Sequence, residues 1–377
     1  MANNSINLAT LDFNTIKENL RTHLRGQDMF KDYDFDGANI SVLLDVLAYN
    51  TSLQAFYMNM LTSESFLDSA QLRSSVISHA KELNYLPRSA RSAVAKVKLT
   101  VEQSGSDTLI IPKGTSFTSS FNFQTYTFTT SEVKSYYSAL NEETNTYSFI
   151  TDDIEIYEGF YVTESYVMNY ATEGLKFILS NPSVDTSSII VNVIEDGGSS
   201  IIPYTLSDTL LGLNSNSKNY FLQASEQDKY EIIFGDDIVG RKPADGAVIA
   251  IQYRSSSGKT PNGANSFTID GDITSDSSGR ITVQTISKSA GGDDAESIAS
   301  IKFNAPRHFQ TQERAITTSD YETLMKSKFP EIDAISVYGG ELVTPPQYGR
   351  VFIALSIAGI DGLPDSIGAS LHRGATH

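Results

Sequence analysis

The feature that most constrains the fold of this chain is a change of hydrophobic period near residue 93. Before it, apolar residues recur every three or four positions, beginning with Phe13, Ile16, Leu20 and Leu24, which is the spacing of one helix face. After it, the run Val94 to Val101 approaches the two-residue alternation that is typical of a half-buried strand. Both periods in separate blocks of one chain predict an α+β multidomain protein.

The helical period predicts an N-terminal helical segment over residues 1–93. Further helices are expected from Ile40 to Met60 and from Leu72 to Leu86, where the following Pro87 disfavours helical geometry. A helical segment of about 75 residues is small for a core of its own, so we expect partner helices to complete it. The candidate partner-facing residues are Phe13, Ile16, Leu20, Leu24, Leu43 and Leu47. Internal packing of the first four is the open alternative.

The alternating period predicts a β-rich, antiparallel middle region over residues 94–289 that divides into two subdomains. Short runs rich in β-branched and aromatic residues are separated there by Gly, Asn, Asp and Ser, as in sheets with one buried face. Five glycines are interpreted as structural turn positions, because glycine adopts positive φ at little cost. They are Gly114, Gly235, Gly240, Gly291 and Gly292.

Helical character returns after residue 290, which predicts a mixed α+β C-terminal region over residues 290–377. Asp294 is the expected N-cap of one helix, and a second is expected from Tyr321 to Lys328. Strands are expected around Ile332–Val337 and Val351–Ile357. The final residues 368–377 resemble neither a helix end nor a closed strand, so we interpret this region as incomplete.

Charge and cysteine content exclude several classes of function. The chain carries 28 Lys and Arg against 45 Asp and Glu, a net charge of −17, which disfavours nucleic acid or an anionic membrane as the main partner. With no cysteine, disulfides, thiolate nucleophiles and Cys-ligated metal centres are excluded. The N-terminus lacks the basic and apolar regions of a secretory signal, so we expect a protein made in the cytoplasm without such export.

The strongest apparent motif for chemistry is Ser257-Gly258-Lys259-Thr260, which matches the end of a phosphate-binding P-loop. The full motif requires a glycine where this chain has Tyr253, and a helix where Pro261 follows. A hairpin turn is therefore the favoured interpretation.

Histidines and paired aspartates are the remaining candidates for chemistry. His308 lies near Glu313 and Asp320 in sequence, without a recognisable nucleophile or a metal-ligand spacing. The pairs at 152–153, 236–237 and 293–294 are interpreted as solvated turns, with a bound cation as the alternative. We expect no catalytic residue, no cofactor and no metal site.

Several motifs, taken in order, resemble one family. They are Leu86–Ala93, Ile111–Thr115, Phe234–Pro243, Gly291–Ser297 and Arg314–Thr317. This order is similar to the baseplate J-like wedge proteins of contractile-tailed bacteriophages. The segments Gln27–Gly37 and Leu47–Asn50 narrow the resemblance to the large wedge subunit of T-even-type phages.

The resemblance implies a structural and non-enzymatic role in the virion, in a tail baseplate assembled in the host cytoplasm. It implies two copies of the subunit in each wedge, joined to other wedge proteins through a helical bundle, and transmission of the change that triggers sheath contraction. It also implies a longer subunit than this sequence. A β-rich glycan-binding adhesin or tail-tip module is the alternative, and a polysaccharide-degrading enzyme is a third, less supported class.

Overall fold

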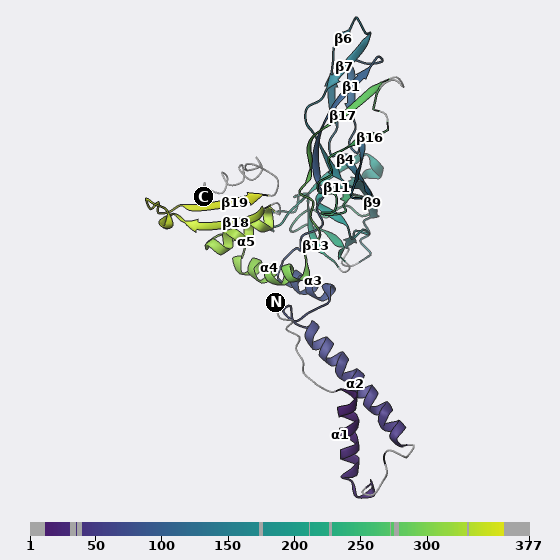
Figure 1. Ribbon diagram of the computed structural model, residues 1–377, viewed down its shortest axis with the longest axis vertical. Helices are drawn as coiled ribbons and strands as arrows, with labels where there is room; N and C mark the ends of the chain where they lie inside the picture. Colours follow the sequence, from purple (N-terminus) through teal and green to yellow (C-terminus); the bar gives the residue numbers. More distant parts are fainter. Residues whose placement is uncertain are drawn as a thin grey trace. The chain divides into compact units, whose positions relative to one another are not determined.

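The computed structural model describes residues 12–30, 35, 40–172, 176–210, 212–225, 228–271, 273–274, 279–329 and 332–357. The predicted incomplete tail at residues 368–377 lies outside these ranges. The chain divides into two compact units, Met1–Glu82 and Leu83–His377. Figure 1 shows their elements in chain order, and each unit is described by itself below.

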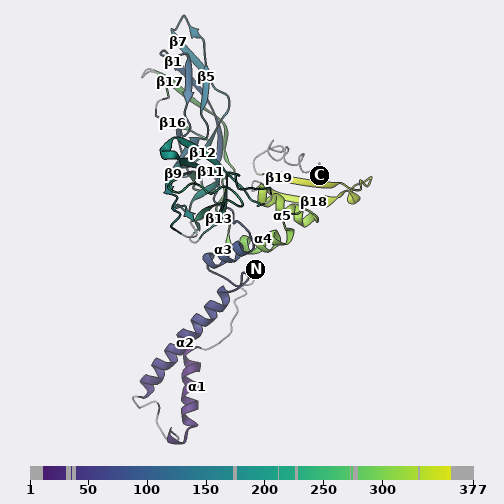
Figure 2. The ribbon, with the colours of Figure 1, turned by 180° about the vertical axis from the view of Figure 1, so that it is seen from behind.

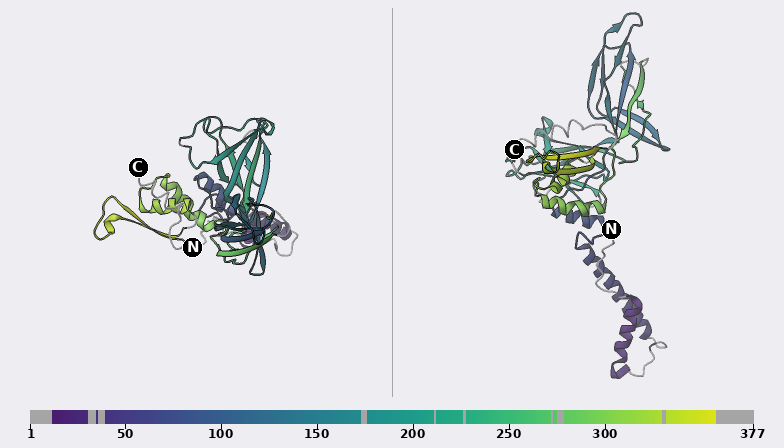
Figure 3. Two further views of the ribbon diagram at one scale, coloured as in Figure 1. Left: turned by 90° about the horizontal axis from the view of Figure 1, so that it is seen from above. Right: turned by 60° about the vertical axis from the view of Figure 1, so that its left-hand side comes forward.

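The first unit is helical, as the apolar period predicts. It contains α1 (Phe13–Arg25), a short 3-10 turn, α2 (Ile40–Glu64) and α3 (Arg73–Glu82). The Asp12 carboxylate caps α1 by accepting a hydrogen bond from Thr15 N at 2.8 Å, and this bond lowers the pKa of Asp12. The helix ends at Gly26, whose N–H donates to the carbonyl oxygens of the last turn. Figure 3 shows α1 lying along α2.

The turn between α2 and α3 is fixed by side chains of its own. The Glu64 carboxylate accepts hydrogen bonds from Gln71 N at 2.8 Å and Leu72 N at 3.2 Å. Ser63 and Ser69 each donate to the backbone carbonyl of the other, at 3.2 and 2.6 Å. These bonds satisfy backbone groups that a helix end leaves open, so α3 starts at a defined place.

The second unit begins with an eight-stranded sheet that is ordered β16-β3-β4-β8-β1-β7-β6, with β17 on the other edge of β1. All its pairs are antiparallel. The sheet covers a core that contains Leu99, Phe117, Phe128 and Ile156. The strand bounds are β1 Val94–Gln103, β3 Ser116–Phe121, β4 Gln124–Thr130, β6 Leu140–Asn141, β7 Thr146–Ile150, β8 Ile154–Glu158, β16 Thr268–Asp270 and β17 Arg280–Ala290. A two-stranded sheet joins β2 (Thr108–Ile111) to β5 (Lys134–Tyr137).

A seven-stranded sheet with a core of its own follows, ordered β10-β14-β13-β12-β11-β15-β9. Its pairs are antiparallel except β12–β13, which is parallel over two residue pairs. Tyr253 and Ile251 of β15 are completely buried in this core. The bounds are β9 Phe160–Val167, β10 Phe177–Ile178, β11 Val184–Glu195, β12 Ser200–Leu206, β13 Asn219–Ala224, β14 Tyr230–Phe234 and β15 Val248–Ser255. The two sheets have separate cores, and the division of residues 94–289 into two subdomains stays a prediction.

A buried cation joins the two sheets. Arg254 of β15 lies 4.4 Å from the ring centroid of Tyr157 on β8 and donates a hydrogen bond to Tyr161 Oη of β9 at 2.8 Å. Its Nη1 lies 3.8 Å from the carboxylate of Asp185 on β11, which also accepts from Ser92 N at 3.1 Å. Arg254 and Asp185 are 4% and 3% exposed, so this ion pair is shielded from water.

The C-terminal part of the second unit packs two helices with a β-hairpin. Helix α5 (Thr318–Lys328) lies on the hairpin of β18 (Ile332–Gly339) and β19 (Val351–Ile357), as Figures 1 and 2 show. Helix α4 (Ile298–Thr311) precedes it. The predicted N-cap Asp294 is wrong: Ser297 caps α4, and Asp294 instead pairs with Lys259 Nζ at 2.7 Å.

The segment of residues 83–93 belongs to the second unit, although the predicted helical segment extended to residue 93. The reason is a set of contacts with residues far along the chain. Arg91 and Asp293 exchange two backbone hydrogen bonds, and the buried Glu296 carboxylate accepts from Tyr85 Oη at 2.9 Å and Arg88 N at 3.1 Å. Ser300 Oγ and Asn304 Nδ2 of α4 donate to the same carboxylate. The first strand, β1, still begins at the predicted residue, Val94.

We predict that His308 makes stability depend on pH near neutrality. Its ring lies against Tyr85, with centroids 5.6 Å apart, and burial lowers its pKa below 6.5 despite the opposing effect of Glu313. A depressed folded-state pKa stabilises the fold above the unfolded value, and this contribution is lost as the pH falls through the folded value. Thermal melts should therefore show a larger fall in Tm between about pH 7.5 and about pH 5.5 for the wild type than for His308→Gln. The control is a His23→Gln variant, because His23 is exposed on α1. Equal falls in Tm in all three proteins would contradict the prediction.

Candidate partner interface

Four of the predicted partner-facing residues lie on α1 and face α2. Ile16 is only 5% exposed, and Phe13, Leu20 and Leu24 are half-buried. Opposite them, α2 buries Leu44 and Ala48, and the Lys17 ammonium pairs with the Asp45 carboxylate. The α1 stripe is therefore largely packed within its own unit, which is the alternative that the sequence left open.

The other two predicted residues, Leu43 and Leu47, lie on the exposed side of α2, at 63% and 53% exposure. They belong to a much larger set of apolar side chains that the helix presents to solvent. The exposed set is Val42, Leu43, Val46, Leu47, Tyr49, Leu53, Phe56, Tyr57, Met58, Met60 and Leu61. We call it the α2 apolar face. Contiguous exposed apolar surface of this kind marks an interaction site.

The angular width of the α2 apolar face indicates how many neighbours it needs. At 100° per residue, its members span an arc of about 200° around the helix axis, from Phe56 to Met58. The stripe that one packed neighbour covers is about 100° wide. The α2 apolar face is thus wide enough for two neighbouring helices, in addition to α1 on the opposite side.

The chemistry of the face is almost free of charge. Helix α2 contains only two ionisable carboxylates, Asp45, which pairs with Lys17, and Glu64, which accepts bonds from the α2–α3 turn. Exposed polar side chains on the arc are the amides of Asn50 and Gln54. Such a surface suits apolar helices with few polar contacts, because an unpaired charge would be costly to bury there.

The sequence reasoning missed most of this face. It included Leu43 and Leu47 but placed most of the predicted interface on α1, because α1 shows one clear apolar side. Helix α2 is apolar almost all round and has no single side to follow. A helix that is apolar all round is usually a buried helix, so the composition of α2 was the available signal of an interaction surface.

The five predicted turn glycines lie in loops, for two different physical reasons. Gly114, Gly240 and Gly291 have positive φ, as expected. Gly235 and Gly292 do not, and they are needed for close backbone contact instead. A Cβ on Gly235 would lie 2.2 Å from the carbonyl oxygen of Gly240, and one on Gly292 would lie 2.4 Å from that of Gly258.

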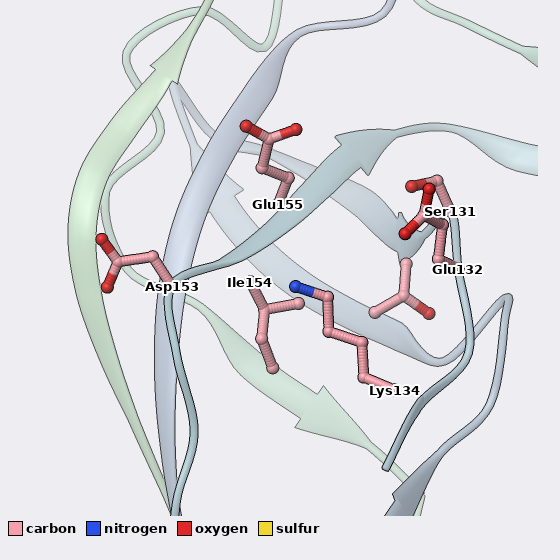
Figure 4. Close-up of a pocket in the computed structure, with 7 residues that line it drawn as sticks. Ser131, Glu132, Lys134, Asp153, Ile154 and Glu155 are labelled. Atoms are coloured by element: carbon pink, nitrogen blue, oxygen red, sulfur yellow. The ribbon is translucent and has the colours of Figure 1, made fainter. Parts of the chain in front are cut away.

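A small polar cavity beside the first sheet is an alternative site. It has a volume of about 240 Å³ and is lined by Thr130, Ser131, Glu132, Lys134, Asp153, Ile154 and Glu155. Figure 4 shows the Asp153 carboxylate turned away from the Lys134 ammonium. Glu155 is paired with Lys96 at 3.3 Å. The cavity is smaller and more polar than ordinary small-molecule sites of about 300–1,000 Å³.

The other predicted chemical candidates lie in turns. Lys259 of the P-loop-like stretch is exposed and bound to Asp294, which raises the pKa of Lys259. Asp236 accepts from Ile238 N and Val239 N within its own loop. Within the described ranges, no group of three or more His, Cys, Asp or Glu side chains could hold a metal ion. Among the described helices, none is both long enough and apolar enough to cross a membrane.

Comparisons with known proteins bear on both ends of the chain. The helical domain of gp6-like baseplate wedge proteins matches residues 12–85, which include the α2 apolar face. C-terminal domain I of the baseplate structural protein gp6 matches residues 317–366. Baseplate wedge protein gp6 of Enterobacteria phage T4 is 28% identical over 349 residues, which are 85% of this chain and 50% of that protein. The chain therefore spans about half the length of this relative.

A solved structure of the anti-feeding prophage (AFP) baseplate, determined by cryo-EM with 6-fold symmetry, also aligns. It covers 89% of this chain and 68% of that chain, with a TM-score of 0.32 and 13% identity, a level that does not define a shared fold. The T-even part of the predicted resemblance is confirmed by the T4 relative, whereas the wider baseplate J-like resemblance stays a prediction. With gp6-like domain models matched near both ends and a T4 relative aligned with 85% of its length, the chain is similar to gp6-like baseplate wedge proteins.

Proposed function

We propose that this chain is a structural component of a phage tail baseplate wedge, located in the virion, and that it acts by assembly and not by catalysis. The observation that carries this proposal is the α2 apolar face. Eleven apolar side chains exposed on one helix are unfavourable in water, and an exposed patch of this size marks a surface that another molecule covers. The T4 relative, a baseplate wedge protein, supports the same role.

The partners that fit the α2 apolar face are helices of other wedge proteins and the α2 of a second copy of this chain. An arc of about 200° accommodates both at once. The near absence of charge makes self-association of α2 possible despite the net charge of −17 on the chain. The bundle would therefore hold two copies of this chain together with a helix from another protein.

The second unit would serve as a spacer that transmits displacement when the sheath contracts. Its two sheets are joined by the buried Arg254 of β15, which lies against the Tyr157 ring of β8, and by the hydrogen bonds that Glu158 of β8 accepts from Ser256 Oγ and Ser257 N. Such connections favour motion of the unit as one body, because packed interiors deform little.

Charge placed on the α2 apolar face should strongly weaken assembly and leave the sheets folded. The test is a Val46→Asp/Leu53→Asp double variant, co-expressed with the other wedge proteins encoded in the same phage genome. We expect native mass spectrometry to show the hetero-complex weakened by about a hundredfold or more, since each buried carboxylate costs several kcal/mol. The circular dichroism of the β-sheets should be unchanged.

The matched control is Asn19→Asp, which adds one charge to the exposed side of α1. It should form the complex at wild-type concentrations. A double variant that still assembles like the wild type would contradict the proposed interface. A wild-type chain that forms no complex with the wedge proteins but binds host glycans would favour the adhesin interpretation instead.

A further inference from the structure

The tip of the β3–β4 hairpin carries an aromatic side chain that the fold does not use. Strands β3 and β4 pair from Ser116–Thr129 to Phe121–Gln124, which leaves only Asn122 and Phe123 in the turn. The Phe123 side chain is fully exposed to solvent. We propose that Phe123 is a docking residue that inserts into an uncharged apolar pocket on another protein subunit, at a contact separate from the α2 apolar face.

The backbone at Phe123 is strained, and the strain serves no packing purpose within the described chain. Both turn residues have positive φ, 49° at Asn122 and 62° at Phe123, as a type I′ turn requires. Asparagine tolerates this conformation and glycine is the usual second residue, whereas a bulky side chain there is an outlier. An outlier that buries nothing in its own fold points to a function outside it.

The hairpin holds the ring in a fixed position. Phe117 and Phe128 at its base are completely buried, and Phe128 packs edge-on against Phe267 at 4.9 Å between centroids. Nearer the tip, Tyr126 Oη donates to Gln124 Oε1 at 2.6 Å. Because a two-residue turn on paired strands leaves little freedom, docking of Phe123 would lose little conformational entropy.

The chemistry of the hairpin identifies the kind of partner. Residues 114–131 contain no charged side chain, although 19% of the chain is charged. The complementary surface is therefore an uncharged pocket, with polar groups around it for the amides of Asn122 and Gln124. A bilayer fits less well. One ring buries about 150–250 Å², and even a myristoyl chain gives only marginal membrane binding.

Photocrosslinking in assembled baseplates tests the contact. The full-length protein would carry p-benzoylphenylalanine in place of Phe123, and an otherwise identical protein would carry it in place of exposed Tyr137 on β5. We expect irradiation to link position 123 to apolar residues on another subunit, in several-fold higher yield than position 137. Absence of such a link, or a link only to added phosphatidylcholine vesicles, would overturn the proposal.

A second variant separates docking from folding. Phe123→Gly creates the Asn-Gly turn that type I′ geometry prefers, so the free protein should melt at a higher temperature than the wild type. In competition with wild-type protein during assembly, it should be depleted roughly tenfold, the factor expected from losing a buried phenyl ring. Asn122→Gly keeps the ring and should assemble like the wild type. Equal incorporation of Phe123→Gly would overturn the proposal.

Discussion

Replacement of Arg254 by methionine will lower the free energy of unfolding by about 3–5 kcal/mol, because it leaves the buried Asp185 carboxylate without its cation. Methionine keeps much of the side-chain length and apolar contact with Tyr157 and Tyr161. The loss is therefore mainly electrostatic. Chemical denaturation followed by the circular dichroism of the sheets would measure it.

A double-mutant cycle separates the ion pair from the packing around it. Asp185→Asn combined with Arg254→Met should recover part of the loss, about 1–3 kcal/mol, since no buried charge then remains. Lys113→Met is a matched control, because its ammonium lies 4.6 Å from the same Tyr161 ring but is more exposed. It should cost at most about 1 kcal/mol. A cost below about 1 kcal/mol for Arg254→Met would show that Asp185 does not depend on the arginine.

Replacement of Glu296 by glutamine will cost about 2–4 kcal/mol, although the two side chains have nearly the same shape. The carboxylate accepts from four donors, namely Tyr85 Oη, Arg88 N, Ser300 Oγ and Asn304 Nδ2. Glutamine offers one acceptor oxygen, and its amide N–H groups would face donors. Each buried donor that loses its partner costs about 1–3 kcal/mol.

The control for Glu296→Gln is Ser300→Ala, which removes one donor and keeps the carboxylate. It should cost about 1 kcal/mol, the ordinary contribution of one hydrogen bond. Limited proteolysis gives a second measurement, because segment 83–88 should become cleavable in Glu296→Gln and stay protected in Ser300→Ala. If both variants were equally stable, the four bonds to Glu296 would not hold this segment in place.

Local pattern was enough to predict the elements and the class of fold. The stripe from Phe13 to Leu24 is a helix, and the alternation that starts at Val94 is β1. These signals are local, because each depends on which side of one element meets the core. The ordered motifs were also sufficient to predict the similarity to T-even wedge proteins, since motif order can be recognised without knowing how the strands pair.

Contacts between distant residues could not be predicted in the same way. Asp294 has the chemistry of an N-cap, but its carboxylate forms an ion pair with Lys259. Ser297 caps α4 instead. Arg254 looks like any strand arginine until β8, β9 and β11 surround it. Gly292 looks like a turn glycine, whereas its role depends on the backbone of Gly258, which lies far from it in the sequence.

The interface prediction shows the same limit in one helix pair. Phe13, Ile16, Leu20 and Leu24 form an apolar stripe, and a stripe alone does not say whether the covering helix belongs to the same chain. In the structure α2 covers it, and α2 then exposes a wider apolar face of its own. Which of two apolar helices faces outward depends on how they pack together. The hydrophobic period of each helix does not contain that information.

The pairing of β1 with β17 sets an order of events during synthesis. Val94 pairs with Ala290, so the edge of β1 cannot be covered until β17 has been made. At about 5–20 residues per second, the ribosome needs roughly 10–40 s to deliver that strand. Throughout that interval a ten-residue strand is open to pairing with another chain. Production of this protein should therefore depend on translation speed and on chaperones that shield nascent strands, and slow or paused ribosomes between these two strands should favour aggregation.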